Sequence, residues 1–212
     1  MSDRAATLST SEAPLVPGIS PQVYSRADFR RVADMIHSEA GIVLSDGKAM
    51  LAYSRIAPLL RKSRATGFGE FLDLLEGDAA LKNRVIASLT TNHTYFNREP
   101  HHFEHFTQHV RPKLVASAKD GKAVRLWSAG SSSGEEIWTL MMVLMGDDAS
   151  ESRDLLHRNI IALASDLADH AVSAAARARY PAGSVEAVPE KLRELWCQRQ
   201  GDEIQIRETL HT

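Results

Sequence analysis

Apolar residues recur at helical spacing through the first third of the chain. Phe29, Val32 and Ile36 share one side of a helix that Ser25 begins as N-cap and Gly41 ends. This pattern predicts a small helical bundle in front of the rest of the chain. Its other helical stretches cover residues 48–64, 71–75 and 81–89.

The second half alternates between apolar runs and helical patterns. Residues 124–128 and 160–164 are short apolar runs typical of buried parallel strands, and helical patterns follow each of them. Strand, helix, strand and helix in this order predict the start of a doubly wound, Rossmann-like α/β sheet. The remaining elements expected here are helices over 99–118, 135–145, 168–179 and 190–197, and a strand over 203–207.

Composition excludes several classes of protein. A net charge of −2 gives no general case for nucleic acid or a membrane surface, and no apolar run reaches the ~18 to 20 residues of a membrane span. We expect residues 1–21 to form a flexible leader, and this stretch lacks the apolar core of a secretion signal. The single cysteine, Cys197, cannot form an internal disulfide, which fits a cytoplasmic protein, and we expect a packed or an exposed thiol rather than a nucleophile.

The second helix of the bundle is one-sided in charge. It contains no acid, and Lys48, Arg55 and Lys62 are seven residues apart and share a face. Two interpretations stay open: a solvated basic face, or a docking face for an acidic partner, because local basic charge steers association. Pro58 lies inside this stretch and should kink or split the helix.

Histidines follow the fourth-residue spacing of a helix at His101, His105 and His109. Such a row can hold a metal ion from one face, but no cysteine and no acid other than Glu104 lies near it. We therefore expect exposed helix histidines and no metal site.

The loop after the first strand carries the candidate chemistry. Small residues fill it, and Glu135 and Glu136 open the following helix. Carboxylates at this place repel phosphate and attract a cation or hydroxyl groups. No Gly-Lys-Ser/Thr follows, and the loop also lacks the Gly-x-Gly-x-x-Gly of dinucleotide sites.

A second acid, Asp166, ends the second strand. Ligands of open α/β sheets bind beyond the carboxyl ends of the strands, so Glu136 and Asp166 describe a nucleoside site that lacks phosphate. S-adenosylmethionine, a nucleoside with a sulfonium cation, fits this acidic lining.

Three stretches together resemble the glutamate methyltransferases of chemotaxis receptors, the CheR family. Residues 89–103 read LTTNHTYFNREPHHF and are similar to the family pattern LTTNxTxFFRExxHF. Residues 126–136 read LWSAGSSSGEE and resemble the family's cofactor loop, and residues 164–166 resemble its ribose-binding motif. The resemblance extends from about residue 22 to the end of the chain.

This resemblance implies transfer of a methyl group from S-adenosyl-L-methionine to glutamate side chains of bacterial chemoreceptors, leaving S-adenosyl-L-homocysteine. Carried over by position, Arg98 is the candidate catalytic residue, and it lines the cofactor site together with Asn92, Thr94, Glu136 and Asp166. The implied partner is the cytoplasmic domain of a methyl-accepting chemoreceptor. The residues implied to dock it are Arg55 and Lys62.

The expected organisation follows from the patterns and the resemblance. A leader over 1–21 precedes a helical receptor-docking domain over 22–95, a linker helix over 96–120 and a partial methyltransferase domain with the start of a β-subdomain over 121–212.

The chain departs from the family pattern in several places. Asn97 stands where the family usually has phenylalanine, and Ile137-Trp138-Thr139 replace Pro-Tyr-Ser. The family's later strands are absent, so the resemblance implies a domain incomplete at its C-terminal end, with sheet edges that a second copy of the chain would cover. The alternative function is an adaptor module or fragment that binds receptor without catalysis.

Overall fold

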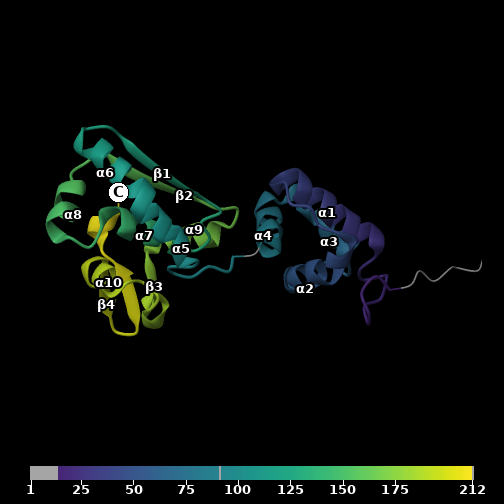
Figure 1. The fold of residues 1–212 in the computed structure, drawn as a ribbon. Helices are drawn as coiled ribbons and strands as arrows, with labels where there is room; N and C mark the ends of the chain where they lie inside the picture. Colours follow the sequence, from purple (N-terminus) through teal and green to yellow (C-terminus); the bar gives the residue numbers. More distant parts are fainter. Residues whose placement is uncertain (1–13, 91, 212) are drawn as a thin grey trace, which may run out of the picture. The chain divides into compact units, whose positions relative to one another are not determined.

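The computed structural model describes residues 14–90 and 92–211, and they form two compact units divided after Thr90. Figure 1 shows the two units as ribbons. Each unit has its own apolar core. None of the described helices is long and apolar enough to cross a membrane.

The N-terminal unit is entirely helical, as the sequence predicts. The Ser25 side chain accepts a hydrogen bond from the Asp28 N–H, the Asp28 carboxylate accepts one from the Ser25 N–H, and Gly41 ends the first helix at φ 67°. Local capping signals therefore fix both ends of this helix. The helices are α1 (Arg26–Ala40), η1 (Asp46–Lys48), α2 (Ala49–Leu60), α3 (Phe68–Gly77) and α4 (Ala79–Leu89).

Aromatic packing closes the core of this unit. Tyr24 and Phe68 are fully buried, and their ring centroids are 4.3 Å apart. Pro58 lies inside α2, which ends at Leu60 and does not continue to Arg64 as the charge pattern suggested. The helix is therefore not split at Pro58, and because proline disturbs the turn before it, Pro58 does not account for the end at Leu60.

The C-terminal unit combines a parallel strand pair with a small antiparallel sheet (Figure 1). Its elements are α5 (Pro100–His105), η2 (Phe106–Val110), α6 (Arg111–Lys119), β1 (Val124–Ala129), α7 (Glu135–Met145), α8 (Ala149–Leu155), β2 (Ile160–Ser165), α9 (Asp169–Arg177), β3 (Arg179–Pro181), η3 (Ala182–Val185), α10 (Glu190–Trp196), β4 (Cys197–Gln200), β5 (Glu203–Ile206) and η4 (Glu208–Leu210).

Strands β1 and β2 run parallel, which confirms the prediction from the apolar runs. Val124 lies opposite Ile160, and the register continues to Ala129 opposite Ser165. Helix α7 packs along both strands, and α9 packs against β2. Because Ala129 and Ser165 are partners at the ends of β1 and β2, both strands end beside the loop that leads into α7.

The two faces of this strand pair differ in burial. Leu126 and Ala162 pack against the core, whereas Trp127, Leu163 and Ile161 are 68%, 57% and 44% exposed. Within the described residues, the second face of the pair carries no helix that buries these side chains.

Several expectations about local structure were wrong. The helix expected over 99–118 is divided by a π-helical turn, η2, directly before Arg111-Pro112. Proline cannot supply the N–H of a regular helical turn, which explains a wider turn at this place. Helix α8 was not among the expected elements; the Asp148 side chain caps the N–H groups of Ser150 and Glu151 at its start. Strands β3 and β4 were also missed; both pair with β5.

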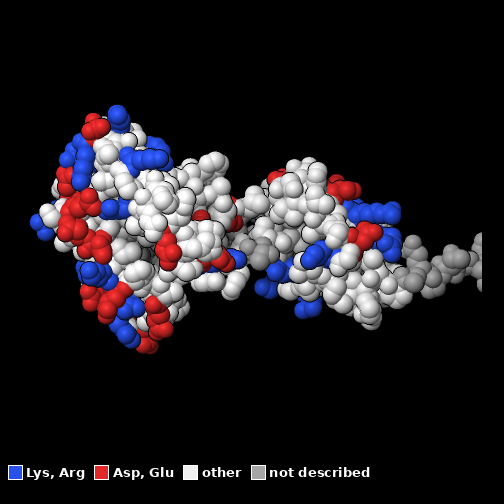
Figure 2. Space-filling model, viewed as in Figure 1, with Lys and Arg blue, Asp and Glu red and all other residues white. Residues whose placement is uncertain are grey.

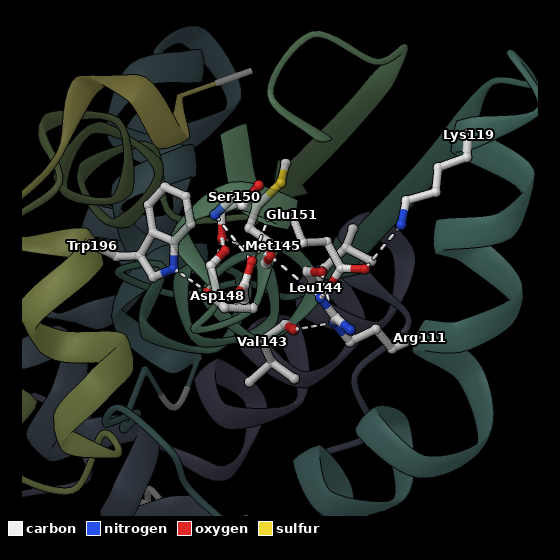
Figure 3. Close-up of polar contacts among 11 residues, drawn as sticks. Arg111, Lys119, Val143, Leu144, Met145, Asp148, Ser150, Glu151 and Trp196 are labelled. Atoms are coloured by element: carbon white, nitrogen blue, oxygen red, sulfur yellow. Dashed lines mark hydrogen bonds and ion pairs between the residues drawn. The ribbon is translucent and has the colours of Figure 1, made fainter. Parts of the chain in front are cut away.

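Side chains from distant segments hold the C-terminal end of α7 (Figure 3). Arg111 Nε donates to the Val143 and Leu144 carbonyl oxygens at 3.0 and 2.9 Å, and Arg111 Nη2 lies 2.5 Å from the Glu151 carboxylate. A cation at a helix C-terminus also interacts favourably with the negative end of the helix dipole. The helix that leads out of the loop is thus fixed at its far end.

Candidate active site

The loop between β1 and α7 needs glycine at its end. Gly134 has φ 93°, and a Cβ added there would lie 2.6 Å from the Ala175 Cβ. Any larger residue would push α7 away from α9. The small residues of the sequence pattern therefore permit close packing as well as a tight turn.

Ser132 connects this loop to two other segments. Its N–H donates to Asp166 Oδ2 at 2.8 Å, and its hydroxyl donates to the Asn92 carbonyl oxygen at 3.0 Å. Ser132 also has φ 50°, a conformation that non-glycine residues keep only where surrounding contacts hold them. The end of β2, the loop and the polar segment before α5 thus meet at one residue.

Arg98 lies in a turn with two residues of positive φ. Asn97 has φ 54° and Glu99 has φ 55°, one on each side of the arginine. Arg98 Nη1 donates to the His93 carbonyl oxygen at 3.0 Å, and its guanidinium carbon lies 5.8 Å from the centre of the Tyr95 ring. Among the described residues, no carboxylate forms an ion pair with Arg98.

A cavity of about 340 Å³, here called the Arg98 cavity, lies between this turn and the loop. Its volume is in the range of small-molecule sites. Its lining residues are His93, Thr94, Tyr95, Arg98, Glu99, His102, Phe103, Gly130, Ser131, Ser132 and Glu136.

The wall of the cavity presents polar groups to a ligand. Ser131 Oγ is buried and has no hydrogen-bond partner within the described part of the chain. Glu136 Oε1 accepts a hydrogen bond from Ser128 Oγ at 2.9 Å, while Glu135 is held by the Ser133 hydroxyl at 2.7 Å. Among the described residues, a hydroxyl without a hydrogen-bond partner, an acid and a guanidinium without an ion pair fit a ligand with hydroxyl, cationic and carboxylate groups.

The predicted site residues fall into two groups. Thr94, Arg98 and Glu136 line the cavity itself. Asn92 and Asp166 are not part of its lining and contact its wall through Ser132. The second oxygen of Asp166, Oδ1, accepts the Ala168 N–H at 2.9 Å, so both oxygens of this carboxylate hold backbone amides.

The two predicted docking residues differ in what surrounds them. Arg55 Nη1 donates to the Ser88 and Thr90 carbonyl oxygens at 3.0 and 2.9 Å, at the end of α4. Lys62 is exposed, and no ion pair involves it in residues 14–90 and 92–211. Figure 2 shows the lysine and arginine side chains of the N-terminal unit at separate places on the face in view.

The sequence analysis did not single out Tyr180, which directly follows the helix expected over 168–179. Tyr180 is 5% exposed, and its hydroxyl donates to the Ser133 carbonyl oxygen of the loop at 2.7 Å. Burial, and then the nearby Glu135 carboxylate, raise the pKa of Tyr180, so the hydroxyl keeps the proton it donates. Tyr180 lies within the three-residue strand β3, which has no strong sequence pattern of its own, so the sequence gave no signal for this role.

The histidine row forms no ligand set in the structure. In the part of the chain that the structure describes, no three His, Cys, Asp or Glu residues are grouped to hold a metal ion. His105 and His109 lie side by side with ring centroids 4.6 Å apart, and both are exposed.

Comparisons with known proteins cover both units. The family model described as "CheR methyltransferase, SAM binding domain" matches residues 92–212, and "CheR methyltransferase, all-alpha domain" matches residues 27–90.

The curated proteins similar to this chain include several chemotaxis protein methyltransferases. A probable chemotaxis protein methyltransferase of Rhizobium etli is 35% identical over 164 residues, which is 76% of this chain and 60% of the relative. A chemotaxis protein methyltransferase of Borreliella burgdorferi is 30% identical over 88% of this chain and 66% of its own length. The Escherichia coli chemotaxis protein methyltransferase is 41% identical over 57% of this chain and 40% of its own length. The chain therefore spans 40–66% of the length of these relatives.

Proposed function

The chain belongs to the CheR methyltransferase family, and on that premise we propose that it binds S-adenosyl-L-methionine in the Arg98 cavity and methylates glutamate side chains of chemoreceptors. The observation that carries this proposal is that Thr94, Arg98 and Glu136, from segments some forty residues apart, line one cavity. The expected product is S-adenosyl-L-homocysteine.

Each residue of the site has a proposed role. Glu136 and Ser131 line the cavity, and the Glu136 carboxylate would accept hydrogen bonds from the nucleoside. Asp166 holds the Ser132 and Ala168 amides, and its remaining lone pairs would meet the ribose hydroxyls. Arg98 has no ion-pair partner among the described residues, so its guanidinium is available to a carboxylate of the cofactor or of the acceptor.

The reaction demands little proton chemistry from the protein. A glutamate side chain is already ionised near pH 7, so its oxygen can attack without a general base. When bound, the cofactor supplies an electrophilic methyl group on a sulfonium, and the carbon–sulfur bond breaks as the carbon–oxygen bond forms. The protein's contribution is to hold the acceptor in line, and positioning of this kind is worth roughly 7–11 kcal/mol.

The N-terminal unit is the proposed receptor-docking domain. Lys62, two residues after the end of α2, and Arg55, within α2, supply positive charge that would attract an acidic receptor surface. We also predict a cytoplasmic location, which composition favours. A further prediction is that two copies of the chain associate through the exposed edges of the strand pair.

Two experiments test the proposed function. Calorimetry with S-adenosyl-L-homocysteine measures whether the chain binds cofactor, which an adaptor without catalysis need not do. Transfer of a labelled methyl group to a receptor cytoplasmic domain then measures the activity itself. Cofactor binding without methyl transfer would support the proposed cofactor site but not the proposed activity. Absence of both binding and transfer would reject the proposed function.

We also expect that Asp166→Ala weakens the affinity for S-adenosyl-L-homocysteine by about tenfold or more, because a carboxylate that accepts several hydrogen bonds is lost. An unchanged dissociation constant would remove Asp166 from the site. Asp202→Asn, an exposed acid in the turn between β4 and β5, is the matched control.

A further inference from the structure

The turn that carries Arg98 is held in an unfavourable backbone conformation. Asn97 and Glu99 both have positive φ, and non-glycine residues in this region persist only where neighbouring contacts over-determine them. Asparagine tolerates the left-handed conformation better than most residues, which gives a physical reason for Asn97 at this place. The glutamate after Arg98 has no such advantage, so other contacts must hold the turn.

One contact joins this turn to the helix that begins at the loop. The Asn97 N–H donates to Thr139 Oγ1 at 3.1 Å, and Thr139 Oγ1 in turn donates to the Glu135 carbonyl oxygen at 2.7 Å. A hydroxyl has one proton and two lone pairs, so the bond to Glu135 leaves a lone pair free for Asn97. Thr139 is 0% exposed, and water cannot replace it.

The Asn97 side chain forms a second link. Its Nδ2 donates to the Ala187 carbonyl oxygen at 2.8 Å, in the segment before α10. This bond lies near solvent, whereas the Thr139 hydroxyl is buried, so the Thr139 contact is the stronger restraint.

We propose that Thr139 is a positioning residue for Arg98: its buried hydroxyl holds the Asn97 amide and thereby fixes the arginine over the Arg98 cavity. Thr139 itself does not line the cavity, and it acts through Asn97. The link also sets the distance between Arg98 and Glu136, because Glu136 lies in the first turn of the helix to which Thr139 belongs. This inference rests on the proposed role of Arg98 in the methyltransferase site.

The test compares Thr139→Val, which keeps the shape but removes the hydroxyl, with Thr139→Ser, which keeps the hydroxyl. Thr107→Val is the control for loss of a helical threonine hydroxyl at an exposed position, because Thr107 also donates to a carbonyl oxygen four residues earlier, that of Phe103. Amide hydrogen exchange of residues 93–99 and the affinity for S-adenosyl-L-homocysteine are measured for each variant.

In Thr139→Val we expect about fivefold or greater acceleration of exchange at Asn97 and about fivefold weaker affinity, as loss of one buried hydrogen bond implies. We expect both quantities to stay within about twofold of wild type in Thr139→Ser and Thr107→Val. Wild-type behaviour of Thr139→Val in both assays would overturn the proposal, and so would equal acceleration throughout residues 92–211.

The proposed function and the role of Thr139 can fail separately. If the wild-type chain binds no S-adenosyl-L-homocysteine, the proposed function fails, and the exchange of the Asn97 amide alone decides whether Thr139 holds the turn. If wild type binds and Thr139→Val binds equally well with unchanged exchange, the proposed function stands and the role of Thr139 is rejected.

Discussion

Residues next to each other in the sequence take different roles at this site. Glu136 lines the Arg98 cavity, while the carboxylate of Glu135 is held by Ser133 at the start of the same helix. The family resemblance singled out Glu136, and the structure separates the two acids physically. A pattern of residue types alone cannot distinguish Glu135 from Glu136, because both are acids at a helix N-terminus.

Cys197 supports a prediction at the scale of one group. It is buried, and burial raises the pKa of its thiol to about 11. Since the thiolate is the reactive form, we expect alkylation by iodoacetamide at pH 7.5 to be at least about tenfold slower in the folded chain than in urea. Equal rates in the two conditions would show that Cys197 is accessible.

At the scale of elements, helix ends were more predictable than pairing. The bounds of α1 follow from Ser25 and Gly41, and α7 begins and ends as expected at Glu135 and Met145. The signals for these ends are local capping and turn residues. Strands β3 and β4 have no comparable signal, because each is defined by its pairing with β5 and not by its own sequence.

The candidate site was predictable to a similar degree. Thr94, Arg98 and Glu136 were named through the family resemblance of two short motifs, and the structure brings the three residues to one cavity. Thr139 and Tyr180 were not found, because each acts through a backbone group that only the folded chain brings near. Their residue types are common in any core.

The anchor at the end of α7 predicts a pH dependence of stability. Hydrogen bonds from Arg111 and then from Lys119 lower the pKa of Glu151. A carboxylate whose pKa is lower in the folded state than in the unfolded state contributes its full stabilisation at any pH above the unfolded-state pKa. This stabilisation is lost as the pH falls through the folded-state pKa. Glu151 therefore stabilises the C-terminal unit at neutral pH and not in acid.

We expect Glu151→Gln to lower the free energy of unfolding by about 1–2 kcal/mol at pH 7. The effect is modest because the side chains of Arg111 and Glu151 are both partly exposed, and solvent screens their interaction. The difference from wild type should shrink below about pH 4.3, the ordinary pKa of glutamate. Urea unfolding at several pH values measures this. Glu194→Gln, whose carboxylate has no hydrogen bond or ion pair among the described residues, serves as control. A difference that is constant with pH would contradict the assignment.

At the scale of the whole molecule, the proposal divides cofactor binding and receptor docking between two units. We expect Lys62→Glu to weaken capture of a receptor cytoplasmic domain and to leave the affinity for S-adenosyl-L-homocysteine unchanged, because Lys62 lies in the N-terminal unit. Pull-down and calorimetry on the same preparation measure the two quantities. A parallel loss of both would make the docking assignment wrong.

Arg55 needs a separate interpretation, because its guanidinium already binds carbonyl oxygens at the end of α4. We expect Arg55→Glu to lower the melting temperature of the N-terminal unit by several degrees, as loss of about 1–3 kcal/mol in a small domain implies. Lys62→Glu should leave this temperature unchanged, so the pair separates docking from stability. Equal melting temperatures for the two variants would mean that the Arg55 contacts contribute little.

The central claim is that a nucleoside cofactor binds in the Arg98 cavity, and calorimetric titration with S-adenosyl-L-homocysteine of wild type, Glu136→Gln and Glu135→Gln tests it most directly. The account predicts saturable binding to wild type, about tenfold weaker binding to Glu136→Gln, and binding to Glu135→Gln within about twofold of wild type. Absence of binding to wild type, or equal affinities in all three proteins, would contradict it.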